Sequence, residues 1–395
     1  MSSEAVILDE AHGREMAARG DYSFETADDL AAFEEPWRAL EERGTATPYQ
    51  RFDWVSAFTR AGVDGVRDVR VVLVRDAGGR PVLLLPLAVT RRAGVAVAAP
   101  IGGKHANFQI PLTCRTLAAR LGAAEQRKLL VAAGRSLGID AFDIPYVPRV
   151  WDGAPVALAS LGRPSPSNAY GVTIEGDPDE AVRKAMSTEG RRKLRNKERA
   201  IGKIGEVAFL RATTEADVDH VLGAFFRQKS DRFREQGIRD PFAGAATDFI
   251  RAASLAGLAG GRPAIELSAI TLDGRVIAAF GAASDASRTS GMFISFEPEF
   301  GRYSPGDQLV AKVVANSAER GRRVFDLGVG EAEYKHRFCR EAEELVDVLL
   351  PVTAAGRLYV EAWQSATELK RMVKQSEPAM KAVRALRRLR ARLGG

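Results

Sequence analysis

The sequence has few residues of the kinds that build metal sites and disulfides. Its only two cysteines, Cys114 and Cys339, lie far apart among 395 residues, and its four histidines are scattered. The cysteines offer neither a disulfide framework nor a paired-thiol metal site, so we expect a reducing compartment and no bound metal. No Walker phosphate loop, GxGxxG fingerprint, HExxH or GxSxG motif occurs either.

Long uncharged apolar runs are also missing. The most apolar stretch, VVLVRDAGGRPVLLLPLAV (71–89), is interrupted by charges and by Gly-Gly. A membrane-spanning helix needs roughly 20 mostly apolar residues, so none is expected. The opening MSSEAVILDEAHGREM lacks the basic start and apolar core of a signal peptide. We therefore expect a cytoplasmic protein.

Charge is spread unevenly. Residues 365–395 hold nine basic and two acidic residues, so the net charge of this segment is +7. The whole chain has a net charge of +6, so the charges of all other residues sum to −1. Nucleic-acid binding by the whole surface is therefore not indicated. Segment 379–393 contains MKAVRALRRLRARL, which reads as a basic amphipathic helix. It could contact an anionic inner-membrane surface or pack with its charged side outward.

Two short patterns recur in the same order. DAGGRPVLLLPLAV (76–89) resembles TLDGRVIAAFGAAS (271–284), and GIDAFDIPYVP (138–148) resembles GRRVFDLGVGE (321–331). This repetition predicts a duplicated α/β domain, as the length also favours. Prolines cluster and periodicity fades over 145–168. We expect domains at 1–165 and 166–360 and a helical tail at 361–395.

The second half predicts an α+β domain rather than a doubly wound sheet, because helices come first and a run of strands follows. Its most regular patterns predict a basic helix within 178–205, further helices and strands around 206–327, and a last strand at 344–352. The expected helices are 215–233, 243–258 and 307–320, and the expected strands are 206–212, 263–271, 275–283, 289–296 and 322–327.

The stretch YSPGDQL (303–309) lies between an expected strand and an expected helix. One interpretation is a plain turn in which Ser304 or Asp307 caps the helix. The other is an anion site, because a helix beginning near Gly306 presents unpaired N–H groups and its positive dipole end. Arg302 lies within reach of an anion bound there.

The motifs around this loop resemble a known family in their order. The first motif is TPYQRFDW (47–54), near the N-terminus, and the second is the basic stretch RRKLRNKERAIGKIGEVAF (191–209). The third, FDLGVGEAEYKHRF (325–338), follows the YSPGDQL loop and the helix after it. In this order they resemble the CelD/Fem-like branch of the GNAT acyltransferase superfamily, with its BioF-type, cellulose-biosynthesis acetyltransferase-like domain. The resemblance covers about residues 35 to 355.

The resemblance implies two tandem GNAT-like domains, each a mixed, mainly antiparallel sheet flanked by helices. The first would be degenerate and face the acceptor, while the second would bind acyl-CoA between splayed strands. The sequence departs from the GNAT phosphate signature because no second glycine follows Gly306 at the expected spacing. The implied cofactor-binding residues are Phe293, Ser295, Arg302, Tyr303, Ser304, Gly306, Asp307 and Gln308.

The implied chemistry is attack of an amine on a thioester, which needs a base, an oxyanion partner and a proton donor. By resemblance, Asp326 would be the base or amine anchor, Tyr334 the proton donor, and Lys335 the partner of the oxyanion or thiolate. The implied acceptor-side residues are His105, Asn107, Gln109 and Glu331.

The expected function is N-acyl transfer from acyl-CoA to an amine or hydroxyl of an envelope, polysaccharide or lipid precursor. A tRNA-dependent aminoacyl transfer and a non-catalytic partner of a polysaccharide-synthesis complex are the alternatives. For the basic stretch 191–203, a solvated helix face is favoured over a tRNA contact, because no aromatic residues are interleaved for base stacking.

Overall fold

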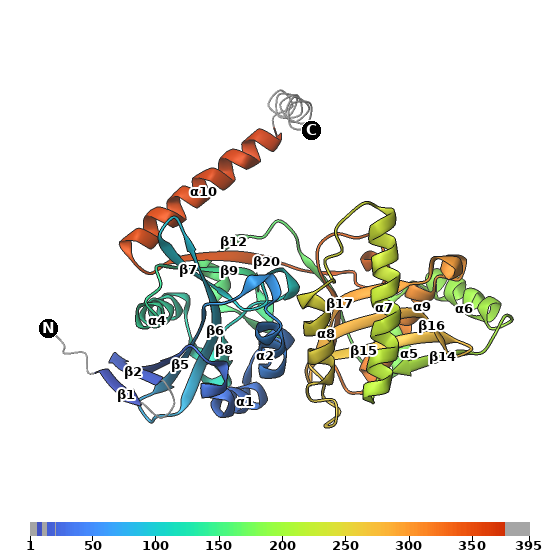
Figure 1. Ribbon diagram of the computed structural model, residues 1–395, viewed down its shortest axis with the longest axis horizontal. Helices are drawn as coiled ribbons and strands as arrows, with labels where there is room; N and C mark the ends of the chain where they lie inside the picture. Colours follow the sequence, from blue (N-terminus) through green and yellow to red (C-terminus); the bar gives the residue numbers. More distant parts are fainter. Residues whose placement is uncertain (1–5, 10–13, 20, 376–395) are drawn as a thin grey trace.

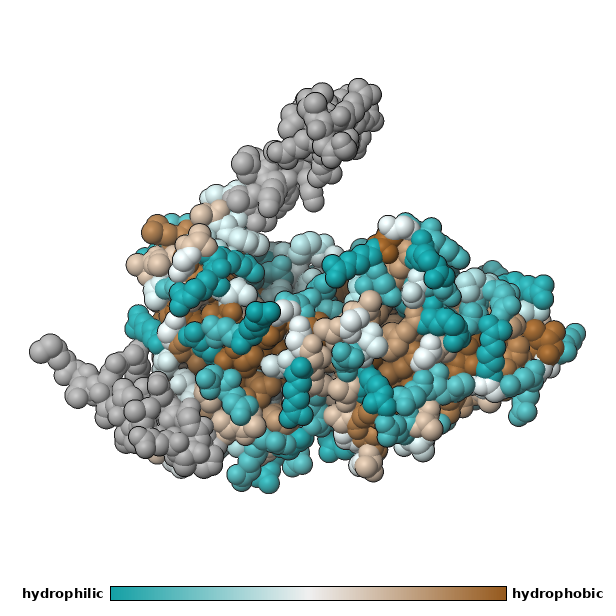
Figure 2. Space-filling model, viewed as in Figure 1, coloured by the Kyte–Doolittle hydropathy of each residue, from teal (hydrophilic) through white to brown (hydrophobic). Residues whose placement is uncertain are grey.

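The computed structural model describes residues 6–9, 14–19 and 21–375. The segment 379–393 lies outside these residues. Two sheets with flanking helices stand side by side (Figure 1). On the face shown in Figure 2, hydrophilic residues (teal) predominate and hydrophobic ones (brown) form smaller groups.

The first sheet is built mainly from N-terminal strands in the order β1-β2-β3-β5-β6-β7-β9-β20-β12, with β4 and β8 paired beside β6. Helix α4 packs on this sheet, and α10 begins against β7, β9 and β20. Its strands are β1 (Val6–Asp9), β2 (Arg14–Arg19), β3 (Tyr22–Ala27), β4 (Gly44–Thr45), β5 (Val69–Asp76), β6 (Pro81–Arg92), β7 (Val95–Pro100), β8 (Leu112–Cys114), β9 (Ala141–Pro148), β12 (Arg163–Pro164) and β20 (Leu345–Pro351). The helices on this side are α1 (Glu34–Arg43), α2 (Phe52–Arg60), α3 (Arg115–Arg120), α4 (Ala123–Ser136) and α10 (Ala354–Gln375), and a hairpin joins β10 (Val150–Trp151) to β11 (Ala154–Pro155).

The second sheet has the order β14-β15-β16-β17-β18-β13-β19. Helices α7 and α8 pack on one face of it and α9 on the other, with α5 against α9. Its strands are β13 (Ala169–Thr173), β14 (Val207–Arg211), β15 (Ile265–Leu272), β16 (Arg275–Ser284), β17 (Arg288–Phe296), β18 (Val324–Val329) and β19 (Glu341–Glu343). Its helices are α5 (Pro178–Ala185), α6 (Thr188–Ile201), α7 (Glu215–Glu235), α8 (Ala245–Leu255) and α9 (Pro305–Glu319).

The two sheets repeat one topology. In the first, β5, β6 and β7 form an antiparallel run and β7 lies parallel to β9, which contains Phe142. In the second, β15, β16 and β17 do the same and β17 lies parallel to β18, which contains Phe325. The predicted fold class, two tandem domains with mixed, mainly antiparallel sheets and flanking helices, is confirmed.

The chain exchanges strands between the sheets. β13 follows the first domain but pairs with β18 of the second sheet, whereas β20 follows the second domain but pairs with β9 of the first. In Figure 1 the red-orange β20 lies beside β9. The strand expected at 344–352 therefore completes the first sheet, although the sequence groups it with the second domain. The domain bounds 1–165, 166–360 and 361–395 stay a prediction.

The basic helix expected within 178–205 is two helices, α5 and α6. The chain turns extended at Met186 and Ser187, and the Ser187 side chain accepts a hydrogen bond from the N–H of Gly190. This N-cap starts a new helix, which is why the single predicted helix is wrong.

An apolar interface joins the domains. Trp54 and Phe58 of α2 pack edge-on against Phe249 of α8, with ring centroids 5.0 and 5.1 Å apart. All three side chains are almost completely buried. Because such aromatic contacts bury large areas, they hold the second sheet against the first domain.

Candidate active site

The site begins where two parallel strands separate. β17 and β18 pair only over Arg288–Val324, Thr289–Phe325 and Ser290–Asp326, after which β17 continues to Phe296 along β16 but apart from β18. The register between β16 and β17 also shifts just after this point, which makes Met292 a bulge residue. Bulges bend a strand and break its ladder, so both features open the sheet at one place.

A cavity of about 610 Å³ lies at this opening. It runs from α7, past the end of β17, to the start of α9. Its walls combine aromatic side chains with basic ones, and it is lined by Lys229, Arg232, Phe233, Gln236, Phe242, Met292, Phe293, Ile294, Phe296, Gly301, Ser304, Pro305, Gly306, Asp307, Val310, Tyr334 and Arg337. We call this cavity the donor groove.

The start of α9 faces the donor groove. Ser304 precedes the helix with φ +50° and ψ +55°, Pro305 occupies the first turn, and no side chain caps the helix. The left-handed conformation is unfavourable for serine, and such strain concentrates at functional sites. With no cap, the backbone N–H groups of Gly306 and Asp307 are available to an anion in the groove.

Basic side chains surround this helix start. Arg337 lies 2.9 Å from the carboxylate of Asp307, and Lys197 of α6 donates to the Ser304 hydroxyl at 2.6 Å. The charge of Asp307 is thus matched by Arg337, while Arg232 and Lys229 add positive charge from α7. Burial lowers the pKa of Lys229 to about 8, and its ammonium lies over the rings of Phe233 and Phe242.

Tyr334 lines the same groove from the segment after β18. Burial raises the pKa of its phenol. The phenol therefore keeps its proton at neutral pH and can donate it, as expected from the sequence. Whether Tyr334 is catalytic stays a prediction.

Residues 188–336, which carry the groove, match the family model described as an acetyltransferase (GNAT) domain. The match covers most of the strands and helices of the second sheet, and this part of the chain is similar to an acetyltransferase (GNAT) domain. The predicted enzyme type is thereby confirmed at the level of this domain. The comparison with curated proteins found no match to the sequence.

Solved structures share the fold of the chain at low sequence identity. FemX is 11% identical with a TM-score of 0.59, and the match covers 85% of this chain and 98% of that one. A conserved protein of unknown function from Bacteroides thetaiotaomicron is 10% identical with a TM-score of 0.52, covering 82% and 98%. A C-terminal domain of a lysylphosphatidylglycerol synthetase from Agrobacterium fabrum is 13% identical with a TM-score of 0.49, covering 84% and 96%. FemX and the Bacteroides protein show that the fold extends over most of the chain.

Asp326 of the GNAT domain does not reach the donor groove. Its side chain is fully buried, and its carboxylate accepts hydrogen bonds from Arg288 at 3.0 Å, Ser290 at 2.8 Å and the N–H of Gly328 at 2.9 Å. The Ser290 hydroxyl in turn lies 2.8 Å from the hydroxyl of Tyr49 in the first domain. The expectation that Asp326 meets the substrate amine does not agree with this position.

Lys335 is also a structural residue. Its side chain is buried, and the ammonium donates to the carbonyls of Gly328 at 3.1 Å and Val329 at 2.9 Å. Burial lowers its pKa. Because the ammonium holds the end of β18, the expected contact with an oxyanion or thiolate is not available to it.

Several predicted cofactor residues lie beside the groove rather than in it. Ser295 is buried and donates to Gln228 at 2.7 Å, and Gln308 is buried and donates to the carbonyl of Tyr303 at 2.9 Å. Arg302 lies over the ring of Tyr303 and donates to its hydroxyl. Phe293, Ser304, Gly306 and Asp307 do line the groove.

Among the residues expected on the acceptor side, Asn107 reaches the opening between the strands. Its side-chain amide donates to the carbonyl of Gly291 in β17 at 3.1 Å and accepts from the N–H of Val329 in β18 at 3.2 Å. Gly328 makes room for this amide, since its φ is +73° and a Cβ there would lie 2.4 Å from the Asn107 nitrogen. A residue of the first domain thus links the two strands where they separate.

The other three residues of that set lie elsewhere. Gln109 is fully buried and accepts from Gln50 at 3.0 Å, which makes it part of the first domain's core. His105 packs on Phe58, with its Nε2 3.7 Å from Asp64. Glu331 is exposed and accepts from the Tyr170 hydroxyl. None of the three lines the donor groove, and their contact with an acceptor stays a prediction.

Sequence reasoning missed the cations of the groove. Lys229 and Arg232 line it without belonging to any quoted motif. Arg337 lies within the motif 325–338 but was given no role, and Lys197 belongs to the stretch interpreted as a solvated face. The only available signal was that this basic stretch precedes a phosphate-type loop.

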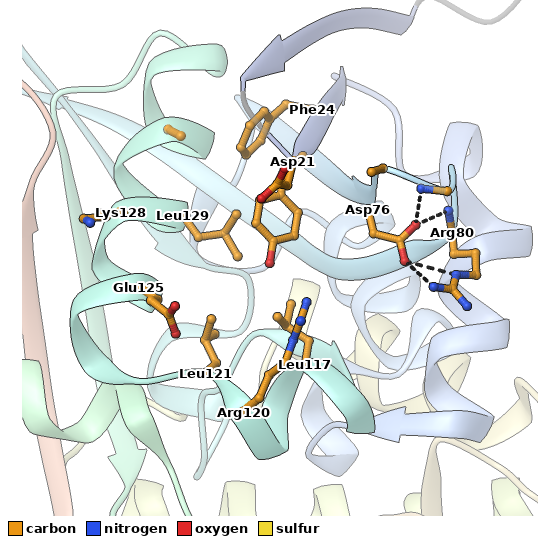
Figure 3. A pocket seen from close by; sticks show the side chains of 14 residues that line it. Asp21, Phe24, Asp76, Arg80, Leu117, Arg120, Leu121, Glu125, Lys128 and Leu129 are labelled. Carbon is orange, nitrogen blue, oxygen red and sulfur yellow. Dashed lines mark hydrogen bonds and ion pairs between the residues drawn. The ribbon is translucent and has the colours of Figure 1, made fainter.

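A larger cavity of about 840 Å³ lies in the first domain, between β3, the β5–β6 turn and helices α3 and α4 (Figure 3). There Asp76 already holds Arg80 at 2.9 Å, and no predicted site residue lines the cavity. Within the described ranges, no group of three or more His, Cys, Asp or Glu residues is placed to hold a metal. Over the same residues, no helix has both the length and the apolar composition needed to cross a bilayer.

Proposed function

We propose that the protein transfers an acyl group from acyl-CoA to an amine, or to a hydroxyl. The observation that carries this proposal is the donor groove, which joins the separated ends of β17 and β18 to an uncapped helix start. The groove supplies backbone N–H groups and basic side chains for phosphates and an apolar aromatic wall for the acyl arm.

In this reaction the acceptor nitrogen attacks the thioester carbonyl, a C–N bond forms and the C–S bond breaks. Tyr334 donates a proton to the departing thiolate. Lys229 lines the same groove, and its neutral form, favoured by burial, accepts the proton of the attacking amine. Asp326 acts only indirectly, by holding Arg288 and Ser290 in place.

We further propose an acceptor on an envelope, polysaccharide or lipid precursor, and the CelD/Fem-like branch as the subfamily. The order of the SPG loop, Phe-Asp strand and Tyr-Lys run supports this proposal. A cytoplasmic location with membrane contact through 379–393 agrees with the basic composition of that segment.

The test is thiol release from acyl-CoA thioesters of increasing chain length with a panel of amines. We expect amine-dependent turnover that Tyr334→Phe lowers by roughly 10²-fold in kcat. Tyr359→Phe on α10 is the matched control and should retain activity. No turnover with any amine or hydroxyl acceptor, together with no CoA binding in calorimetry, would favour a non-catalytic partner in a polysaccharide-synthesis complex.

A tRNA-dependent aminoacyl transfer is the second candidate, because basic helix α6 contacts the loop before α9 through Lys197. Tight tRNA binding whose affinity falls steeply with salt would favour it. Binding of CoA with no such tRNA affinity would exclude it.

A further inference from the structure

A small cavity of about 80 Å³ lies where the two domains meet. Four arginines line it: Arg51 from the first domain, and Arg262, Arg320 and Arg322 from the second. Two carboxylates also line it, so the formal charge of its lining is +2. A positive, partly open cavity of this size is suited to a small anion.

The two carboxylates are already engaged. Glu266 accepts from Arg320 at 2.7 Å and from Arg322 at 2.9 Å. Asp285 accepts from the backbone N–H groups of Ser287 at 2.7 Å and Arg288 at 2.8 Å, within its own turn. Glu266 is therefore already paired with two of the arginines. Asp285 uses only its Oδ1 oxygen in these bonds and forms no ion pair within 4 Å among the described residues.

Arg51 binds the second domain without meeting a carboxylate there. It donates to the carbonyls of Pro263 at 2.9 Å, Ser284 at 2.8 Å and Arg262 at 2.8 Å. Its nearest acidic partner is Asp53, 3.9 Å away in its own domain. Burial lowers the pKa of Arg51 against the attraction of Glu41 and Asp53, and the charge of Arg262 acts in the same direction as burial. The three hydrogen bonds that Arg51 makes to the second domain all go to neutral carbonyls.

Two donors at this cavity have no partner. Ser284 is 1% exposed, and its buried hydroxyl makes no hydrogen bond. The guanidinium of Arg262 makes no hydrogen bond or ion pair with any of the residues described. A buried hydroxyl without a partner is costly, so Ser284 is an independent sign of a missing ligand, and the exposed guanidinium of Arg262 beside it is free to bind one.

We propose that a small oxyanion of the size of inorganic phosphate binds in this junction cavity, held by Ser284, Arg262 and Arg51, and stabilises the contact between the domains. This site is separate from the donor groove. It lies at the end of β16 where Ser284 pairs with Thr289, whereas the groove lies at the opposite end, where Ala278 pairs with Phe296. The proposal does not depend on the proposed acyl transfer.

The test is calorimetric titration of the full-length protein with inorganic phosphate, at an ionic strength held constant with sodium chloride. We expect one saturable site in addition to any binding in the donor groove. Ser284→Ala and Arg262→Ala should each weaken it about tenfold, since each removes one hydrogen bond to the anion. In thermal unfolding, phosphate should raise the Tm of the wild type more than that of either variant.

Two control variants locate the binding. Arg135→Ala changes an exposed arginine on α4 and should bind phosphate like the wild type. Lys197→Ala alters the loop before α9 and should leave the junction site unchanged. The proposal is overturned if phosphate binding is not saturable, if Ser284→Ala and Arg262→Ala bind like the wild type, or if only Lys197→Ala weakens binding. Arg262 is exposed, so its variant is expected to fold even if Ser284→Ala does not.

Discussion

The guanidinium of Arg288 lies 3.0 Å from the carboxylate of Asp326, and both side chains are buried. Two rings of the first domain cover this pair, since the guanidinium carbon lies 4.2 Å from the ring centre of Trp151 and 5.0 Å from that of Phe108. Burial acts to lower the pKa of Arg288, but the attraction of Asp326 and Glu343 outweighs it and the pKa is raised. The ion pair is therefore a joint between the domains.

Removal of Arg288 should strongly destabilise the protein. Arg288→Ala leaves the Asp326 carboxylate buried without its cation, at an expected cost of about 3–5 kcal/mol in the free energy of unfolding. Urea denaturation measures this cost. Arg227→Ala, an exposed arginine paired with Glu297, is the control and should cost under about 1 kcal/mol. Similar costs for the two variants would contradict a structural role for the pair.

Asp326 should make stability depend on pH. Burial raises its pKa from 3.8 to about 6. The folded state thus holds this proton more tightly than the unfolded state, and the resulting stability is present below about pH 4 and lost as pH rises to about 6. Its full value is about 3 kcal/mol. Asp326→Asn should remove this fall from the pH profile of the unfolding free energy, and an unchanged profile would refute the assignment.

Asn107 should couple the first domain to the donor groove. Asn107→Leu removes its hydrogen bonds to Gly291 and Val329, which should cost about 1–3 kcal/mol in stability and weaken CoA-thioester binding. His105→Ala, in the same loop, should have little effect on binding. Equal effects of the two substitutions in calorimetry would show that Asn107 has no special part in shaping the groove.

Asp307 and Arg337 should act as a unit at the start of α9. Arg337→Ala exposes the Asp307 charge to the phosphates of the donor, so we expect CoA affinity to fall about tenfold. Adding Asp307→Asn should restore part of that loss. A double variant that binds CoA as weakly as Arg337→Ala alone would show that repulsion by Asp307 is not the cause.

The loss of a proton from Lys229 should determine how enzyme activity rises with pH. Its pKa of about 8 means that the neutral amine is scarce at pH 6 and predominates above pH 8. If neutral Lys229 accepts the proton of the acceptor amine, kcat/KM should rise with pH, reach half of its maximum near pH 8 and level off about one pH unit higher. Lys229→Met should flatten that rise, while Lys128→Met on α4 should keep it. A rise that persists in Lys229→Met would assign the titration to another group.

Local patterns predicted the elements of the second domain closely. The helix expected at 215–233 is Glu215–Glu235, and the strand expected at 275–283 is Arg275–Ser284. Both depend on short-range hydrophobic periodicity, which is visible in the sequence. The paired hairpins and Phe-Asp strands likewise indicated the duplication.

Contacts between segments that lie far apart in the chain could not be predicted from the sequence. Asp326 and Gln109 look like site residues in their motifs, yet both are buried against segments distant in the chain. Lys335 is buried too, but against the nearby end of β18. The groove cations come from α6, α7 and the segment after β18, which no local pattern joins. Only the tertiary arrangement separates a catalytic side chain from a structural one here.

The exchange of strands between the two sheets also determines when each sheet can be completed during translation. The ribosome must deliver residue 351 before β9 gains its neighbour β20, so the first domain stays incomplete until nearly the whole second domain has emerged. Domains of most proteins fold one after another from the N-terminus. In this chain one edge of β9 stays without its partner strand while about two hundred further residues are translated, at roughly 5–20 residues per second. A stop codon or protease cut just before β20 would therefore leave the first sheet without a strand, although every strand of the second sheet would be present.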